Sequence, residues 1–138
     1  MESLKKAVNR GVKLSIITRL DLEGDTIDYI LSEVNKNDVN RFFKRGEVLE
    51  FVAPKNILHS KIVLIDKKLS IVGSVNLNQR SFFHDTENSL MIWSGDFYNT
   101  MNNVLESYSK DNKSRKITEK LKTNFWKQIV IKAFAKEL

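Results

Sequence analysis

The sequence has no cysteine, a single proline and only two histidines among its 138 residues. Without cysteine there is no disulfide, no thiolate metal ligand and no cysteine nucleophile, and the composition fits a reducing compartment. No apolar run approaches the roughly 20 residues that span a bilayer, and the polar stretch Met1–Gly11 is unlike a signal peptide. Any histidine chemistry is therefore confined to His59 and His84.

The residues that are present, 41% apolar and 29% charged, are typical of one folded domain at this length. The net charge of +6 is unevenly placed, because residues 110–138 hold nine Lys or Arg against three acids, whereas the charges of residues 1–109 sum to zero. A surface that binds a polyanion needs clustered Lys and Arg. The neutral body argues against a nucleic-acid partner, although the basic segment Lys113–Lys116 keeps that alternative open.

Apolar patterns typical of strands and of helices alternate along the chain, which predicts an α/β domain with a mixed β-sheet flanked by helices. Strands are predicted over Val12–Thr18, Val48–Val52, Ile57–Ile65, Leu69–Val72 and Thr86–Trp93. Helices are predicted over Glu2–Asn9, Gly24–Arg45 with a break near Asn35–Asp38, Asp96–Tyr108 and Ile117–Leu138. We expect Ser109–Lys116 to be a polar linker, and Phe82 and Phe83 to be core residues.

The stretch from His59 to Glu87 concentrates polar side chains of chemical interest. In a strand, side chains alternate between faces, so His59 and Lys61 would lie on one face. A plain alternative is that this is an edge strand and that both side chains simply reach water. Gly73-Ser74-Val75-Asn76 follows the next strand, so that pairing of the two strands would bring a hydroxyl and an amide beside them. A nucleophile or base, a fixed positive charge and neutral donors are the groups that phosphoryl transfer requires.

The full spacing, His59-x-Lys61-x4-Asp66-x6-Gly73-Ser74-x-Asn76, resembles the signature of the phospholipase D superfamily. The flanks are similar to bacterial cardiolipin synthases over Lys5–Lys13, Leu77–Ser81 and Trp126–Leu138, with a departure at Asn78, where those enzymes usually have Asp. The resemblance implies a phospholipase D-like half-domain over residues 1–109. A basic linker and an amphipathic C-terminal helix would follow over residues 110–138.

The resemblance also implies a phosphodiester mechanism that uses no metal and no other cofactor. The nucleophile would be His59, which forms a phosphohistidine, and Glu87 would accept a hydrogen bond from it and fix its tautomer. Asp66 is interpreted as a residue of the strand-turn-strand unit or as a plain turn aspartate. The catalytic set would be His59, Lys61, Asp66 and Glu87, and the phosphate-binding set would be Lys61, Ser74 and Asn76.

Active sites of the superfamily use two copies of the motif, and this chain has one. His84 is not a second copy, because no lysine stands two residues after it, and we interpret it as a loop residue. We therefore expect a second half bearing this motif as a partner. It would come from a homodimer or from the N-terminal half of a longer enzyme, and we favour the interpretation that this chain is a C-terminal half, whether it is encoded or cut as such.

The implied reaction is phosphatidyl transfer between phospholipids, as in a cardiolipin synthase, or hydrolysis of a phospholipid. The alternatives are a homodimeric phospholipase D-family endonuclease and an inactive single-motif half. The apolar and lysine-rich faces of Ile117–Leu138 predict either an interfacial helix on an anionic membrane or a helix packed on the domain. We expect the protein in the cytoplasm or peripherally at the inner membrane.

Overall fold

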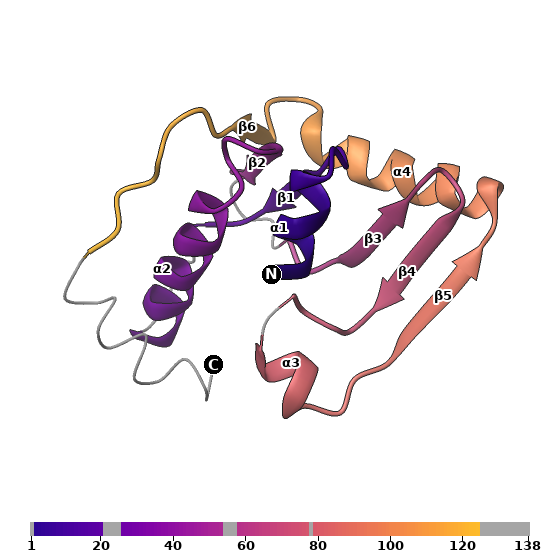
Figure 1. Ribbon diagram of the computed structural model, residues 1–138, viewed down its shortest axis with the longest axis horizontal. Helices are drawn as coiled ribbons and strands as arrows, with labels where there is room; N and C mark the ends of the chain where they lie inside the picture. Colours follow the sequence, from indigo (N-terminus) through magenta and orange to yellow (C-terminus); the bar gives the residue numbers. More distant parts are fainter. Residues whose placement is uncertain (1, 21–25, 54–57, 78, 125–138) are drawn as a thin grey trace.

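The computed structural model describes residues 2–20, 26–53, 58–77 and 79–124 (Figure 1). Its helices are α1 (Glu2–Asn9), α2 (Thr26–Asn40), α3 (Gln79–Phe83) and α4 (Gly95–Ser109). Its strands are β1 (Ser15–Thr18), β2 (Glu47–Phe51), β3 (Lys61–Ile65), β4 (Leu69–Gly73), β5 (Ser89–Trp93) and β6 (Ser114–Lys116). The predicted α/β class is confirmed. Within the described ranges, no helix is long and apolar enough to cross a membrane.

The strands form two three-stranded sheets where the sequence predicts one. The first sheet has the order β1-β2-β6. Strands β1 and β2 are parallel neighbours connected through α2, and β6 is antiparallel to β2. The second sheet is an antiparallel meander of order β3-β4-β5. Helix α4 contacts β3 and β4 of the second sheet and β2 and β6 of the first (Figure 1). This helix therefore joins the two sheets.

The buried apolar core lies at the first sheet and α2. One cluster contains Leu20, Val39, Phe42, Val48 and Ile117, and Phe42 at its centre has no exposed surface. Full burial of such side chains contributes about 1.5–3 kcal/mol each. Among the described residues of the segment 58–93, by contrast, the buried ones are two serines, Ser70 and Ser81. The second sheet is thus much less well buried than the first.

Helix α2 is continuous through Asn35–Asp38, so the predicted break is wrong. That segment contains neither glycine nor proline, so nothing in it forces the helix to end. The weak helix propensity of its asparagine and aspartate residues is overcome by tertiary contacts. The Asn35 side chain donates a hydrogen bond to the Arg19 carbonyl oxygen at 3.4 Å, and Val39 packs in the core.

The predicted linker is wrong for Ser114–Lys116, which forms β6 and pairs with β2. Its Arg115 donates to the carboxylate of Glu50 at 2.7 Å, and the Glu50 side chain is only 5% exposed. A charged partner is needed there because an unpaired buried carboxylate is costly. The division of the chain at residue 109 itself stays a prediction.

The helix predicted over Ile117–Leu138 is also wrong for its first part, because residues 117–124 are not helical. Ile117 is buried in the core. Asn40 donates to the Leu121 carbonyl oxygen at 3.0 Å and accepts from the Leu121 amide at 2.8 Å. These tertiary contacts satisfy backbone groups that a helix would otherwise pair. Residues 125–138, on which the rest of that prediction falls, lie outside the described residues.

Candidate active site

The hairpin of β3 and β4 brings the two parts of the motif together, as the sequence predicts. Its register pairs Lys61 with Gly73, so that Lys61 stands at the open end of the hairpin and Ser74 and Asn76 follow directly on the other strand. His59 precedes β3 by two residues and is exposed. The Lys61 ammonium donates to the His59 carbonyl oxygen at 2.8 Å, which ties the lysine to the backbone of the histidine.

Ser74 links the end of β4 to the start of β5 through several hydrogen bonds. Its hydroxyl donates to the Glu87 carboxylate and accepts from the Asn88 amide at 3.1 Å, and its own amide donates to the Asn88 carbonyl oxygen at 2.9 Å. A hydroxyl has one proton to donate. With that proton directed to Glu87, Ser74 positions the carboxylate. Of the residues that the sequence predicts to bind phosphate, Lys61 and Asn76 remain as donors at this end of the hairpin.

Opposite charges at this end of the sheet influence each other. The hydrogen bond from Ser74, and after it one from Ser81, lowers the pKa of Glu87 below its ordinary value, and nearby Lys61 adds to this effect. Partial burial lowers the pKa of Lys61, and the charge of Glu87 offsets part of that decrease. The carboxylate is therefore held ionised at neutral pH beside the lysine.

Gly73 is required by close backbone packing. A Cβ atom at this position would lie 2.2 Å from the Asn88 carbonyl oxygen and 2.7 Å from the Ser89 Cα atom. No real side chain tolerates such distances. A glycine permits such a tight backbone, and at this position the close neighbour is the backbone at the start of β5.

Asp66 is not brought to the site. It begins the turn after β3, with a positive φ of 50° that aspartate tolerates better than most residues. The five-residue strand β3 separates it from the site end of the hairpin, and at about 3.3 Å per residue this is roughly 16 Å. Its position in the structure is that of a turn residue. His84 is exposed in the segment between α3 and β5, as expected of a loop histidine.

Phe82 and Phe83 are not core residues, which corrects the prediction. They lie on α3, just after the motif, and are 58% and 76% exposed. Helix α3 has five residues, and it makes no extensive contact with another described helix or strand.

Sequence reasoning missed Tyr108, which contacts the middle residue of the His59-Ser60-Lys61 triplet. Its hydroxyl forms a 2.7 Å hydrogen bond with the hydroxyl of Ser60, the residue between His59 and Lys61. Its ring packs edge-on against buried Phe51, with the ring centroids 5.7 Å apart. The sequence signal for Tyr108 is its place on the apolar stripe of α4, which indicates packing but not a polar contact.

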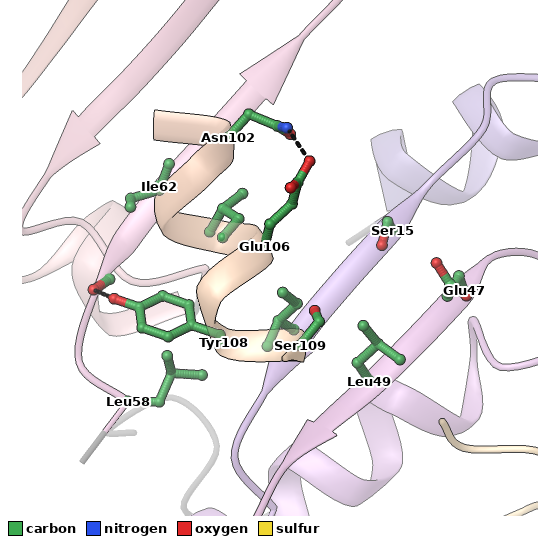
Figure 2. Close-up of a pocket in the computed structure, with 12 residues that line it drawn as sticks. Ser15, Glu47, Leu49, Leu58, Ile62, Asn102, Glu106, Tyr108 and Ser109 are labelled. Atoms are coloured by element: carbon green, nitrogen blue, oxygen red, sulfur yellow. Dashed lines mark hydrogen bonds between the residues drawn. The ribbon is translucent and has the colours of Figure 1, made fainter. Parts of the chain in front are cut away.

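A cavity of about 310 Å³ lies between α4 and the strands on this side of the molecule (Figure 2). Tyr108 and Leu58 lie at one end of it, and Glu47 and Ser15 on β2 and β1 lie across from α4. Ile62 also lines it. Because neighbouring strand residues point to opposite faces, Lys61 belongs to the other face of the sheet, and the cavity is separate from the candidate site.

Comparison with solved structures identifies the fold as that of the phospholipase D-like domains. The chain superposes on phosphatidylserine synthase from Haemophilus influenzae Rd KW20 with a TM-score of 0.70 and 16% identity, over 99% of this chain and 36% of that chain. It superposes on Nuc, a phospholipase D family member from Salmonella typhimurium, with a TM-score of 0.66 and 18% identity, over 86% of this chain and 72% of that chain.

The family is defined more narrowly by sequence. Residues 1–109 match the family model described as "Cardiolipin synthase, PLD-like domain", and the chain belongs to that family. It is 32% identical over 136 residues to cardiolipin synthase A of Buchnera aphidicola subsp. Acyrthosiphon pisum (strain APS), which covers 97% of this chain and 26% of the relative. It is 28% identical over 134 residues, with the same coverage, to cardiolipin synthase A of Serratia proteamaculans (strain 568). The chain thus spans about a quarter of the length of these curated relatives.

Proposed function

We propose that this chain forms one half of a phosphatidyltransferase site that acts on phospholipids through a phosphohistidine at His59. The observation that carries the proposal is the meeting of Lys61 with the Gly73–Asn76 loop at one end of the β3-β4 hairpin, with an ionised Glu87 beside them. A phospholipid substrate is supported by the names of the relatives, which are cardiolipin synthases. The zero charge sum of residues 1–109 disfavours a nucleic-acid substrate.

In the first step, a ring nitrogen of His59 attacks the phosphorus of the phosphodiester. A P–N bond forms and the P–O bond to the leaving alcohol breaks, so that the leaving oxygen needs a proton. In the second step, the hydroxyl of an acceptor lipid or of water gives its proton to the group of the second half that protonated the leaving alcohol. The oxygen attacks the phosphorus, and the P–N bond breaks to release His59. Lys61 and Asn76 stabilise the charge on the phosphate oxygens throughout.

The proposed role of Glu87 is to accept a hydrogen bond from the imidazole of His59 and leave the other ring nitrogen free to attack. A carboxylate has about four lone-pair sites, so the bond that it accepts from Ser74 does not preclude a further one. The lowered pKa of Glu87 favours this role, because an ionised acceptor also stabilises the positive imidazole that forms with the P–N bond.

The proton for the leaving alcohol comes from a second half with its own His-x-Lys triplet. This chain has a single triplet, and His84 lies outside the motif. Help from a general acid is typically worth about 10²–10⁴-fold in rate. We therefore propose that the chain is inactive as a monomer.

The test is to trap the intermediate. The chain is incubated at high concentration with vesicles of a phospholipid labelled at phosphorus, quenched in denaturant at alkaline pH, and digested. We expect label on the peptide that contains His59, loss of label in His59→Ala and retention of label in the matched control His84→Ala. Label at His84, an unchanged signal in His59→Ala, or labelling by single-stranded DNA but not by lipid would contradict the proposal.

A further inference from the structure

The chain segment between Asn76 and Glu87 leaves the candidate site and returns to it. Asn76 belongs to the predicted phosphate-binding set, and the Glu87 carboxylate accepts a hydrogen bond from Ser74. Between these ends the segment contains helix α3, which lies beyond the ends of β4 and β5, at the opposite end of the second sheet from the β3-β4 turn (Figure 1). The side chains of this segment therefore border the site.

Three large apolar side chains of this segment face solvent. Leu77, Phe82 and Phe83 are 55%, 58% and 76% exposed. The other phenylalanines that the structure describes are buried or half-buried. A single exposed apolar side chain is ordinary in a folded protein. Two adjacent exposed phenylalanines, in a short segment that also exposes a leucine, indicate a binding surface instead.

Ser81 fixes α3 to the candidate site. It is 6% exposed, and its side chain forms a hydrogen bond with the Glu87 carboxylate, which Ser74 also contacts. Consecutive Cα atoms lie about 3.8 Å apart, so the backbone of Phe82 and Phe83 is within about 8 Å of a residue that contacts the site. The two rings are thus held at the border of the site while they remain exposed.

The charge of the segment disfavours a polyanion as the partner of these rings. Residues 77–87 contain one basic residue, Arg80, apart from His84, against the two acids Asp85 and Glu87. Nucleobases stack on exposed aromatic rings where a positively charged groove follows the backbone of the nucleic acid, and the composition of this segment does not supply such a groove. Apolar contact is what the segment offers, and hydrocarbon is the chemistry that such contact recognises.

We propose that the surface formed by Leu77, Phe82 and Phe83, here called the α3 surface, inserts into the phospholipid layer that holds the substrate. In such a layer the hydrocarbon begins directly beneath the phosphate. Interfacial elements bury apolar side chains about 5–10 Å into the boundary between headgroups and acyl chains. Helix α3 has five residues and is therefore about 7.5 Å long. Side chains on it can reach hydrocarbon while Lys61 and Asn76 hold the phosphate.

The choice of lipid rests on the proposed function, and the α3 surface adds a way for the site to distinguish a phospholipid from other phosphodiesters. A nucleic acid offers Lys61 the same phosphate but offers Phe82 and Phe83 no hydrocarbon. Packing against a further protein segment would also cover the rings, but it would close the border of a site that a substrate has to enter. We therefore favour the lipid layer as the occupant.

Because the chain has no cysteine, a single probe can be placed on the α3 surface. Phe83→Cys in the full chain is labelled with a fluorophore that responds to polarity. Trp93→Cys is the matched control, since Trp93 is 72% exposed but pairs with Leu69 at the far end of the second sheet. Neutral phosphatidylcholine vesicles are added at about 1 M salt, where the screening length is about 3 Å and the basic residues of 110–138 attract little. We expect brighter, blue-shifted emission at position 83 and an unchanged spectrum at position 93.

Co-sedimentation of unlabelled chains with the same vesicles is the second measurement. The double variant Phe82→Ser, Phe83→Ser should raise the apparent Kd at least tenfold, because buried aromatic surface is lost. Trp93→Ser should leave the Kd unchanged. Circular dichroism spectra and melting curves that match those of the wild type establish that the variants fold.

A label at position 83 that does not respond to vesicles, equal responses at positions 83 and 93, or a response to single-stranded DNA and not to vesicles would overturn the proposal. Phosphohistidine formed from phospholipid while the label at position 83 stays silent would overturn the α3 surface and leave the proposed function standing. A label that enters vesicles on a chain that forms no phosphohistidine would contradict the proposed function and leave the α3 surface standing.

Discussion

Replacement of Gly73 by alanine should destabilise the domain, because the new methyl group has nowhere to go. It would lie 2.2 Å from the Asn88 carbonyl oxygen, and backbone atoms cannot move aside as a flexible side chain can. Overpacking of this kind costs about 1–3 kcal/mol. Displacing the segment before β5 would also weaken the 2.9 Å bond from the Ser74 amide to Asn88, worth about 0.5–1.5 kcal/mol.

One effect acts in the opposite direction. Alanine restricts the unfolded chain more than glycine does, which stabilises by about 0.4–1 kcal/mol where the folded backbone permits it. The net expectation for Gly73→Ala is a loss of about 0.5–4 kcal/mol in the free energy of unfolding. This corresponds to roughly a twofold to thousandfold change in the unfolding equilibrium.

Gly95→Ala is the matched control. Outside its own helix and its chain neighbours, the atom nearest to its Cβ would be the Lys67 carbonyl oxygen at 3.8 Å, an ordinary contact, and Gly95 is the first residue of α4. This variant should be neutral or more stable by up to about 1 kcal/mol. Urea unfolding followed by circular dichroism gives both values, provided that the m-value is unchanged. Equal stability of the two variants would contradict the expectation that close backbone packing requires glycine at position 73.

Further predictions concern the site itself. Ser74→Ala should raise the pKa of Glu87 toward its ordinary value, and carboxyl-carbon NMR titration of wild type and variant measures this directly. Because the folded state lowers that pKa, Glu87 stabilises the fold at pH values above its ordinary pKa, and the stabilisation is lost as the pH falls through the lowered pKa. Tyr108→Phe and Ser60→Ala should each cost about 0.5–1.5 kcal/mol, and additive costs in the double variant would show that their 2.7 Å bond is not shared. With the second half present, excess chelator should leave turnover intact, whereas Lys61→Met should lower turnover by about 10²–10³-fold because the lysine stabilises charge. A strict requirement for a divalent ion would exclude this mechanism.

The part of the site that local sequence specifies was predictable. Two runs rich in β-branched residues, separated by Asp66-Lys67-Lys68, form a hairpin whose register brings Lys61 to Gly73. A hairpin is a contact between near neighbours in the chain, so periodicity and turn residues are sufficient to place its ends together.

The features that sequence reasoning missed depend on contacts between distant residues. The pairing of β6 with β2 joins Arg115 to Glu50, 65 positions apart, and the Tyr108–Ser60 bond spans 48 positions. Neither has a periodic signal. The exposure of Phe82 and Phe83 likewise depends on tertiary packing, which an apolar pair in the sequence does not reveal.

The concentration of buried apolar residues at the first sheet has a consequence for local stability. Segments with few buried contacts open at lower free energy than the core and exchange their amide hydrogens sooner. The sheet β3-β4-β5, with Ser70 and Ser81 as the buried residues of its segment, should therefore exchange well before β2 and its neighbours. Any molecule that binds the folded sheet adds protection that grows with its concentration. The hairpin that carries Lys61 should therefore become more ordered when a ligand or partner binds the folded sheet.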